Sequence, residues 1–244
     1  MEAPIAYRAG DALPRRVGGL SAIALGVSYI AIIGLYLLSG ELPSGAEERL
    51  RHLADHTTVW WMILGLSVAT DLLFLPLMWS LYMLLRDVNK NAMLAGTGLV
   101  GLFVLLDLTV TWPNYSALIT LGDKYVAAGD DTQRAVLLGA ANYANEVLSS
   151  GLFGVYAILV PAVGYFVIGL VMLKGAFGKV AAYLGMAAGI VGVISVVGPL
   201  VVDAVGMAVI LASILTTVWV LLVGYKLLNP TTQPAVAKDE RPAT

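Results

Sequence analysis

The sequence contains no cysteine and few charged residues, and each shortage excludes several classes of protein. Without cysteine there is no disulfide, no iron–sulfur cluster, no thiolate zinc site and no cysteine nucleophile. Only 12% of the 244 residues are charged, whereas about 25% are charged in a typical soluble domain. The net charge of −2 gives no reason to expect a nucleic-acid partner, which would require a basic surface.

Histidine is also scarce, and no lysine lies in the middle of a long apolar run. The only histidines are His52 and His56. Because they are four residues apart on one expected helix, they cannot occupy both axial positions of a haem. The missing lysine excludes a retinal Schiff base. The glycine motifs of nucleotide-binding loops and of serine hydrolases are absent too, so no segment has the signature of one reaction.

Apolar residues make up 59% of the chain, and the mean hydropathy is +0.86. A helix needs about 20 predominantly apolar residues to cross a bilayer. Six segments meet this requirement, namely residues 17–38, 58–85, 92–121, 151–173 and the two parts of 180–228 that flank a turn at 198–203. The sequence therefore predicts an all-α, polytopic bundle of six transmembrane helices over residues 17–228, with the lipid bilayer as its partner.

Lys and Arg residues predict how this bundle is oriented, because cytoplasmic loops are enriched in them. One set of loops and termini contains ten: Arg8, Arg15, Arg16, Arg86, Lys90, Lys174, Lys179, Lys226, Lys238 and Arg241. The other set contains four: Arg49, Arg51, Lys124 and Arg134. We therefore expect a plasma-membrane protein with a cytoplasmic N-terminal segment (1–16) and a disordered cytoplasmic tail (229–244).

A short helix is predicted on the outer side, before the second span. Ser44 and Glu47 have the spacing of a capping box, which marks a helix N-terminus. One face of this helix is largely apolar and contains Ala46, Leu50, Leu53 and Thr57. The opposite face is polar and contains Glu48, His52, Asp55 and His56. Such a helix is expected to lie in the outer membrane interface.

Two imidazoles four residues apart on one helix can bind the same metal ion. His52 and His56 are therefore candidate metal ligands. A polar face that is simply in contact with water explains the same pattern. A second outer helix is expected before the fourth span, with Thr132 as its N-cap. It would present a polar stripe of Asn142, Asn145, Glu146 and Ser149.

Asp71 and Asp107 lie near the middle of the second and third predicted spans. A charged aspartate at that depth costs about 2.5–3.5 kcal/mol, so such residues commonly have a function. Ser67 lies one turn from Asp71, while Thr111 and Asn114 continue the face of Asp107. The two polar faces could equally be structural, with each carboxyl protonated or hydrogen-bonded across a helix interface.

The functional interpretation is an outward-facing cavity for a small cation, a proton or a polar solute, lined by these two faces. Asn142 and Glu146 of the outer helix would close the cavity. Pro76, Pro113 and Pro161 each free a helical carbonyl near the middle of a span. Freed carbonyls beside acidic side chains are typical of transporter helices that bind ions, although prolines also kink membrane helices for packing alone.

Small residues on the fifth predicted span form a face for close helix packing. Gly185 and Gly189 have the Gly-x-x-x-Gly spacing, and Ala188 and Gly192 extend the same face. This face suits either internal packing or a lateral contact with a partner subunit or a second copy of the chain. Trp60, Trp112 and Tyr115 lie near the outer end of their spans and are interpreted as an aromatic belt.

Two segments together resemble a protein family. They are DLLFLPLMWSLYMLLRDVN, at residues 71–89, and FGKVAAYLGMAAGIVG, at residues 177–192. An early Asp, a Leu-rich stretch, a Tyr, an Arg-x-Val-Asn turn and a later glycine-bearing helix resemble the family called domain of unknown function 4386. The resemblance implies an integral membrane protein with six or seven helices and no assigned activity. Asp71 matches its pattern, whereas Asp107, His52 and His56 match no part of it.

Three functions remain open from the sequence. The chain could bind or transport a small cation, proton or polar solute through Asp71 and Asp107. It could instead be a non-catalytic subunit of a larger membrane complex, with Gly185 and Gly189 as the lateral interface. A metal-dependent hydrolase at the outer interface, built on His52 and His56, is the third.

Overall fold

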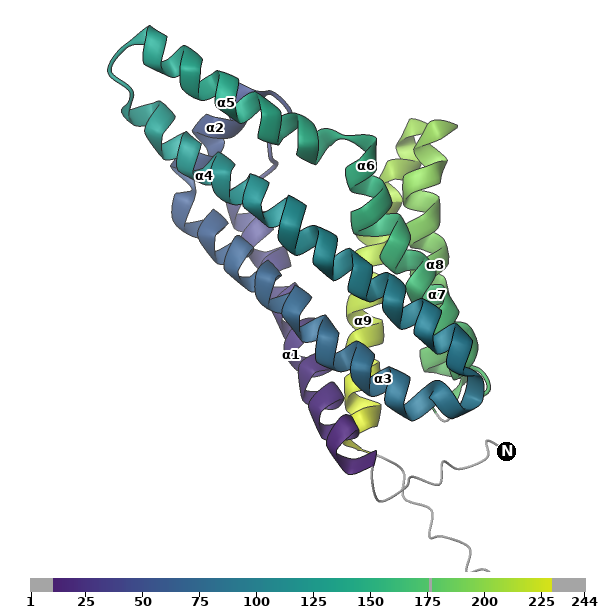
Figure 1. Cartoon of the computed structure of the whole chain (residues 1–244). Coiled ribbons are helices and arrows are strands. Elements are labelled where there is room, and N and C mark those ends of the chain that lie inside the picture. Colours follow the sequence, from purple (N-terminus) through teal and green to yellow (C-terminus); the bar gives the residue numbers. More distant parts are fainter. Residues whose placement is uncertain (1–10, 176, 230–244) are drawn as a thin grey trace, which may run out of the picture.

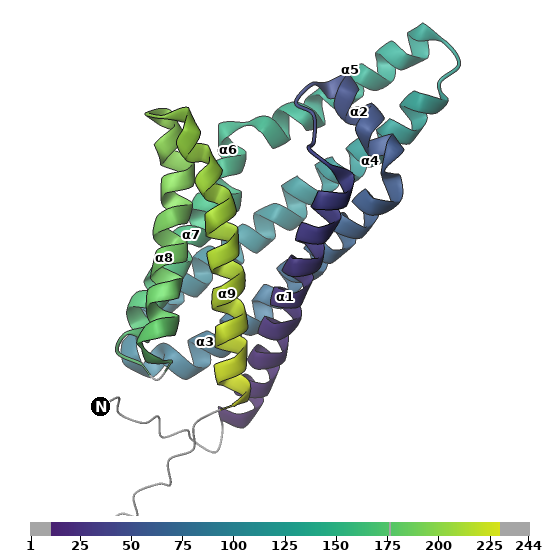
Figure 2. The same cartoon turned by 180° about the vertical axis from the view of Figure 1, so that it is seen from behind.

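The computed structural model describes residues 11–175 and 177–229, and only the backbone at 203 and 204. Throughout these residues all regular structure is helical. Figures 1 and 2 show a bundle of long helices with one end where α1 begins and α9 ends, here called the basal end. The opposite end, where α2 and α5 lie, is called the distal end. Most of the two expected cytoplasmic segments lies outside the described residues.

The elements follow one another along the chain as a series of long helices with short irregular connections. They are α1 (Ala12–Ser39), α2 (Ala46–Asp55), α3 (Thr57–Leu106), the π-helical segment η2 (Asp107–Thr111), α4 (Trp112–Ala127), α5 (Asp131–Ser149), α6 (Gly151–Gly154), the π-helical segment η3 (Val155–Leu159), α7 (Val160–Met172), α8 (Gly178–Val197), the 3₁₀ segments η4 (Gly198–Leu200) and η5 (Asp203–Met207), and α9 (Ala208–Leu228).

Among the described residues, five helical stretches are long and apolar enough to cross a membrane: Ala12–Ser39, Thr57–Ala127, Gly151–Met172, Gly178–Leu200 and Val205–Leu228. Many large apolar side chains on them are exposed, including Leu37 at 81% and Leu38 at 73%. In water, contiguous apolar surface of this kind would drive aggregation, whereas in a bilayer it contacts lipid. The chain is therefore a multi-pass membrane protein.

The second of these stretches, Thr57–Ala127, has 71 residues and is broken at Asn89. A straight helix of that length would be roughly 107 Å long, about three times the hydrocarbon thickness of a bilayer. Asn89 has extended backbone angles (φ −159°, ψ 95°), and its Oδ1 accepts a hydrogen bond from the Ala92 amide at 3.1 Å. Asn89 thus caps a new helical arm, and the two arms fold back toward the distal end (Figure 1).

Each π-helical segment begins six residues before a proline: η2 before Pro113 and η3 before Pro161. Proline lacks an amide hydrogen, and its ring crowds the carbonyl four residues earlier. For Pro113 that carbonyl belongs to Thr109, inside η2, and for Pro161 it belongs to Ala157, inside η3. A π turn widens the helix and relieves this crowding. Pro76, in contrast, lies within α3, which stays α-helical around it.

The glycine face of α8 is used inside the molecule. A Cβ atom placed on Gly189 would lie 2.5 Å from the Ala162 carbonyl oxygen of α7, and one on Gly185 would lie 2.8 Å from Trp219 Nε1 of α9. Side chains at these positions would therefore force the helices apart. Of the two alternatives that the sequence left open for Gly185 and Gly189, internal packing is the one observed, because α7 and α9 cover these two positions.

Helices α1 and α9 are close together at the basal end and separate toward the distal end (Figure 2). At the basal end a Cβ on Gly26 would lie 2.5 Å from Leu221, and one on Gly224 would lie 3.0 Å from Ala22. Farther along α1, a Cβ on Gly34 would meet nothing within 4 Å. Glycine thus permits close packing at one end of this helix pair only.

Helix α2 packs its apolar face on the protein, while its expected position at the membrane interface stays a prediction. Leu50 and Leu53 are fully buried against α4 and α5. A Cβ on Gly122 of α4 would lie 2.7 Å from the Leu50 carbonyl oxygen, so the two backbones are in close contact. The apolar face of α2 is therefore covered by protein side chains and backbone.

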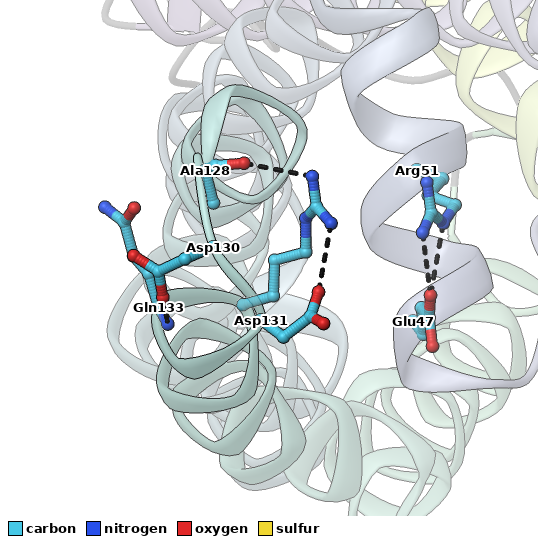
Figure 3. A network of polar contacts seen from close by, with 7 residues as sticks. Glu47, Arg51, Ala128, Asp130, Asp131 and Gln133 are labelled. Carbon is cyan, nitrogen blue, oxygen red and sulfur yellow. Dashed lines mark hydrogen bonds and ion pairs between the residues drawn. The ribbon is translucent and has the colours of Figure 1, made fainter.

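The two distal helices, α2 and α5, each begin at a residue other than the predicted cap. The N-cap of α2 is Gly45 without a side-chain hydrogen bond, so the predicted capping box of Ser44 is not formed. The N-cap of α5 is Asp130, which accepts a hydrogen bond from the Gln133 amide at 2.7 Å (Figure 3). Asp130, two residues before Thr132, is as good an N-cap residue as threonine, and its side chain is the one that bonds a free amide of the first turn.

Ion pairs at the distal end are local. Arg51 pairs with Glu47 at 2.9 Å and Arg134 pairs with Asp131 at 3.3 Å, each within a single helix (Figure 3). The hydrogen bond from Arg51 holds the pKa of Glu47 below its usual range. Exposed pairs of this kind contribute little to stability. The buried leucines of α2, which belong to an apolar cluster with side chains of α3, α4 and α5, therefore matter more for holding α2 in place than these ion pairs do.

We predict that Gly189→Ala destabilises the protein by about 1–3 kcal/mol, because the new methyl group would overlap the α7 backbone. Gly98→Ala is the matched control, because a Cβ there meets nothing within 4 Å and alanine favours a helix by about 0.5–1 kcal/mol. Unfolding in mixed detergent micelles would measure both. Equal stability of the two variants would contradict the close α7–α8 contact.

Candidate functional site

Asp71 and Asp107 come from the two arms of the reversed helix and are buried together inside the bundle. Their exposed fractions are 2% and 6%. The carboxylate oxygen Oδ2 of Asp71 accepts a hydrogen bond from Trp112 Nε1 at 2.6 Å. The two carboxyl groups are close enough to interact electrostatically. The reversal at Asn89 therefore brings together two acids that are 36 positions apart in the sequence.

The carboxyl group of Asp107 is only partly satisfied. Its Oδ1 atom is buried and has no hydrogen-bond partner, although the Thr111 side chain interacts with the same carboxyl group. An unsatisfied buried acceptor costs about 1–3 kcal/mol. A proton or a small cation bound at Oδ1 would remove this cost, so the arrangement favours a ligand of positive charge.

Thr111 also joins the two π-helical segments to each other. Its hydroxyl forms a buried hydrogen bond of 2.9 Å with the Tyr156 hydroxyl of η3. π-Helical turns are rare and occur frequently at functional sites. Here two of them meet across one hydrogen bond, beside Asp107, at the point where the second arm contacts the α6–α7 region.

Five tyrosines lie within electrostatic range of Asp107, and the sequence analysis did not identify them as site residues. Asp107 interacts electrostatically with five tyrosines: Tyr29, Tyr36, Tyr115, Tyr156 and Tyr165. A phenol offers a hydrogen bond at its tip and a negative ring face to a cation. The sequence shows that tyrosines recur within the apolar spans. It does not show that tyrosines from different spans lie near the same carboxyl group.

Trp60, Trp112 and Tyr115, which the sequence analysis interpreted as an interfacial belt, stack on one another. The Tyr115 ring lies 5.9 Å from Trp60, with the rings nearly parallel, and 5.8 Å from Trp112. Trp60 is only 2% exposed. This stack therefore packs against the distal side of the acid pair and is largely shielded from lipid.

The other predicted site residues differ in their positions. Ser67 is buried, whereas Asn114 is half-buried and donates its side-chain amide hydrogen to the Val110 carbonyl of its own helix at 2.8 Å. Asn142 and Glu146 have exposed side chains and do not belong to the buried cluster. Asn145 between them is buried instead, with an unpartnered Oδ1 atom.

A cavity of about 440 Å³ lies between α1, α7, α8 and α9, and its lining residue Phe103 is one helical turn before Asp107, whose amide donates to the Phe103 carbonyl. Phe103 of α3 and part of η3 complete its walls. Three of the tyrosines that interact with Asp107 line it, namely Tyr29, Tyr36 and Tyr165. Neither Asp71 nor Asp107 is among the lining residues.

The two histidines lie side by side on α2, with ring centres 4.7 Å apart. His56 Nδ1 is already 3.0 Å from the His52 carbonyl oxygen. Across the described residues, no group of three or more His, Cys, Asp or Glu side chains is arranged to hold a metal ion. Since protein zinc sites use at least three protein ligands, a metal at His52 and His56 would need a further ligand, and their role as metal ligands stays a prediction.

The described spans and the basal turn at Asn89 agree with the resemblance noted above. The model of the family named domain of unknown function (DUF4386) matches residues 19–228, which is most of the chain. The protein belongs to this family. Neither a curated protein nor a solved structure shows a significant match to the chain.

We predict an interaction between Thr111 and Tyr156 that a double-mutant cycle will detect. Thr111→Val and Tyr156→Phe each remove one hydroxyl and keep most of the side-chain shape. The coupling energy should be about 0.5–1.5 kcal/mol, the net value of a typical hydrogen bond. The coupling energy is obtained from the unfolding free energies of the wild type, the two single variants and the double variant. Strictly additive effects would show that the two π segments are not joined.

We predict that His52 makes the protein less stable in acid. Burial, and then the neighbouring His56, lower the pKa of His52 below its usual value of about 6.5, while Asp55 opposes the shift. A lowered pKa means that the unfolded chain binds a proton more readily, so stability falls as the pH falls through about 6.5. His52→Gln should lose part of this dependence. Unfolding midpoints of both proteins at about pH 8 and about pH 5 would test it, and identical pH profiles would contradict it.

Proposed function

We propose that this protein binds a proton or a small cation at the acid pair Asp71 and Asp107 and uses it to drive the movement of a solute across the membrane. The observation that carries the proposal is the buried, unpartnered Oδ1 atom of Asp107, beside a second buried carboxyl group. Intramembrane acids of this kind commonly mark proton relays and ion pathways.

The two carboxyl groups have different surroundings, which supports different roles. Asp71 is held by Trp112 at 2.6 Å, and this hydrogen bond stabilises its charged form. Asp107 has one oxygen free to accept a proton or a cation. Repulsion between two neighbouring carboxylates makes a positively charged ligand at Asp107 more favourable. We therefore assign Asp107 as the binding group and Asp71 as the fixed partner.

The π segments supply an element that can change with occupancy. Asp107 and Thr111 are the first and last residues of η2, and Thr111 is hydrogen-bonded to Tyr156 in η3. A change in charge at Asp107 would act on Thr111 directly. The movement would pass to the α6–α7 region through the Thr111–Tyr156 bond.

For the membrane topology we propose six spans, with the two arms of the Thr57–Ala127 stretch crossing separately. The basal end would be cytoplasmic. Arg15, Arg86, Lys174 and Lys226 all lie at or beside this end, in agreement with the positive-inside rule. The acid pair would then be nearer the middle of the bilayer than either outer helix.

A role as a non-catalytic subunit has less support. Its proposed interface, the face of Gly185 and Gly189, is covered by α7 and α9. The hydrolase proposal lacks a third ligand beside His52 and His56 among the described residues. The acid pair is thus the feature that the proposed function rests on.

The test combines a spectroscopic titration with a flux assay on purified protein in liposomes. Infrared difference spectra between low and high pH should contain a protonated-carboxyl band that Asp107→Asn removes. The same variant should reduce proton-driven flux about tenfold to a hundredfold, because a hydrogen bond to a charged group contributes about 1.5–3 kcal/mol. Asp55→Asn is the matched control, since Asp55 is exposed on α2.

Asp71→Asn should keep a carboxyl band but change its titration, because the neighbouring charge is gone while Asp107 remains. If the band persists unchanged in both Asp107→Asn and Asp71→Asn, the titrating group lies elsewhere and the proposal is wrong. Flux that is insensitive to both substitutions would also exclude it.

A further inference from the structure

The cavity between α1 and α9 has the size and composition of a small-molecule site. Its volume of about 440 Å³ lies within the range of roughly 300–1,000 Å³ found for ligand pockets. The walls are mainly aliphatic, for example Ile32, Ile158 and Ile210, with the polar groups limited to tyrosine, serine and threonine hydroxyls. Such a lining suits a molecule that is largely apolar and has one polar or charged centre.

The mouth of the cavity opens toward lipid. Four lining residues are well exposed, namely Ile33 at 44%, Tyr36 at 39%, Ile210 at 59% and Ile214 at 48%. All four belong to the membrane-spanning stretches Ala12–Ser39 and Val205–Leu228, whose helices α1 and α9 separate toward the distal end (Figure 2). A ligand would therefore enter sideways from the bilayer, so it must be soluble in lipid.

The charge of the surroundings favours a cation. Tyr29, Tyr36 and Tyr165 line the cavity. The carbonyl of Phe103 in its wall accepts a hydrogen bond from the Asp107 amide, so Asp107 is one helical turn from the wall and within electrostatic range of the three tyrosines. Their ring faces attract a positive charge, typically by about 0.5–2 kcal/mol per contact. Among the described residues, no lysine or arginine contributes to the walls. A negatively charged ligand would be repelled by the carboxylates that attract a cation.

We infer that this cavity binds a hydrophobic cation, with the charged centre among Tyr29, Tyr36 and Tyr165 and the apolar body against the isoleucines near the mouth. The preference for positive charge rests on the proposed function, because it requires that the acid pair can be ionised. The apolar cavity itself does not depend on that chemistry. The acid pair and the cavity would then form one system, in which a proton at Asp107 weakens the binding of the cation.

Tetraphenylphosphonium and tetraphenylborate are suitable probes, because they have nearly the same size and shape and opposite charges. Equilibrium dialysis with the full-length protein in lipid nanodiscs at about pH 8 should show saturable binding of the cation, at least tenfold tighter than that of the anion. Asp107→Asn should weaken binding of the cation about tenfold and leave binding of the anion unchanged or stronger.

Ser213→Phe should block the cavity, because Ser213 lines it and an aromatic ring would occupy its space. Ile190→Phe is the control for this change, since Ile190 is 46% exposed on α8 and does not line the cavity. Cation binding should fall at least about tenfold in Ser213→Phe and stay at the wild-type level in Ile190→Phe.

Equal affinity for the two probes would overturn the inference, and so would cation binding that Ser213→Phe leaves unchanged. These outcomes are separable from a failure of the proposed function, which the infrared titration decides without any ligand. Cation binding that is blocked by Ser213→Phe but insensitive to Asp107→Asn would remove the link to the acid pair and so also contradict the inference.

Discussion

The interior of a bilayer offers no hydrogen-bond partner, and this absence governs the whole structure. Every polar group within the spans must be satisfied by the protein itself or remain at a cost of several kcal/mol. Serine and threonine side chains in the spans mostly meet this demand by bonding carbonyls one turn earlier, as Thr97 does to Met93 and Thr217 to Ser213. Ser80 instead bonds the Pro14 carbonyl of α1 at 2.6 Å and so ties two helices together.

Against this background, the few polar groups that are not satisfied locally become informative. Asp107 keeps an oxygen without a hydrogen-bond partner at a position where one is costly, while Oδ2 of the neighbouring Asp71 accepts a hydrogen bond from Trp112. Evolution could have replaced Asp107 by an apolar residue at a gain in stability, as holds for many buried charges. Its position beside two π turns and a group of tyrosines is consistent with a site in which stability is lowered for function.

The two kinds of backbone irregularity in the bundle serve different purposes. Asn89 ends one arm and begins the next, so it sets the topology. The π turns before Pro113 and Pro161 keep their helices continuous but shift the side chains that follow. They set where Thr111 and Tyr156 meet, and therefore the geometry of the site. The glycines of α8 act in a third way, by allowing α7 and α9 to approach closely enough to enclose the site from one side.

Much of the fold could be predicted from the sequence by itself, because length and hydropathy are local properties. Apolar runs of about 20 residues, the basic turns and the Arg-Asp-Val-Asn pattern before residue 90 were sufficient for the membrane class, the approximate helix ends and the family. The burial of Asp71 and Asp107 also followed, since each lies deep within an apolar run.

Only the tertiary structure decided which polar faces meet. It exposed Asn142 and Glu146, used Gly185 and Gly189 internally, buried the apolar face of α2 against α4, and collected five tyrosines around Asp107. The physical reason is that these outcomes depend on helix rotation and crossing, which are set by side-chain contacts between segments far apart in the chain.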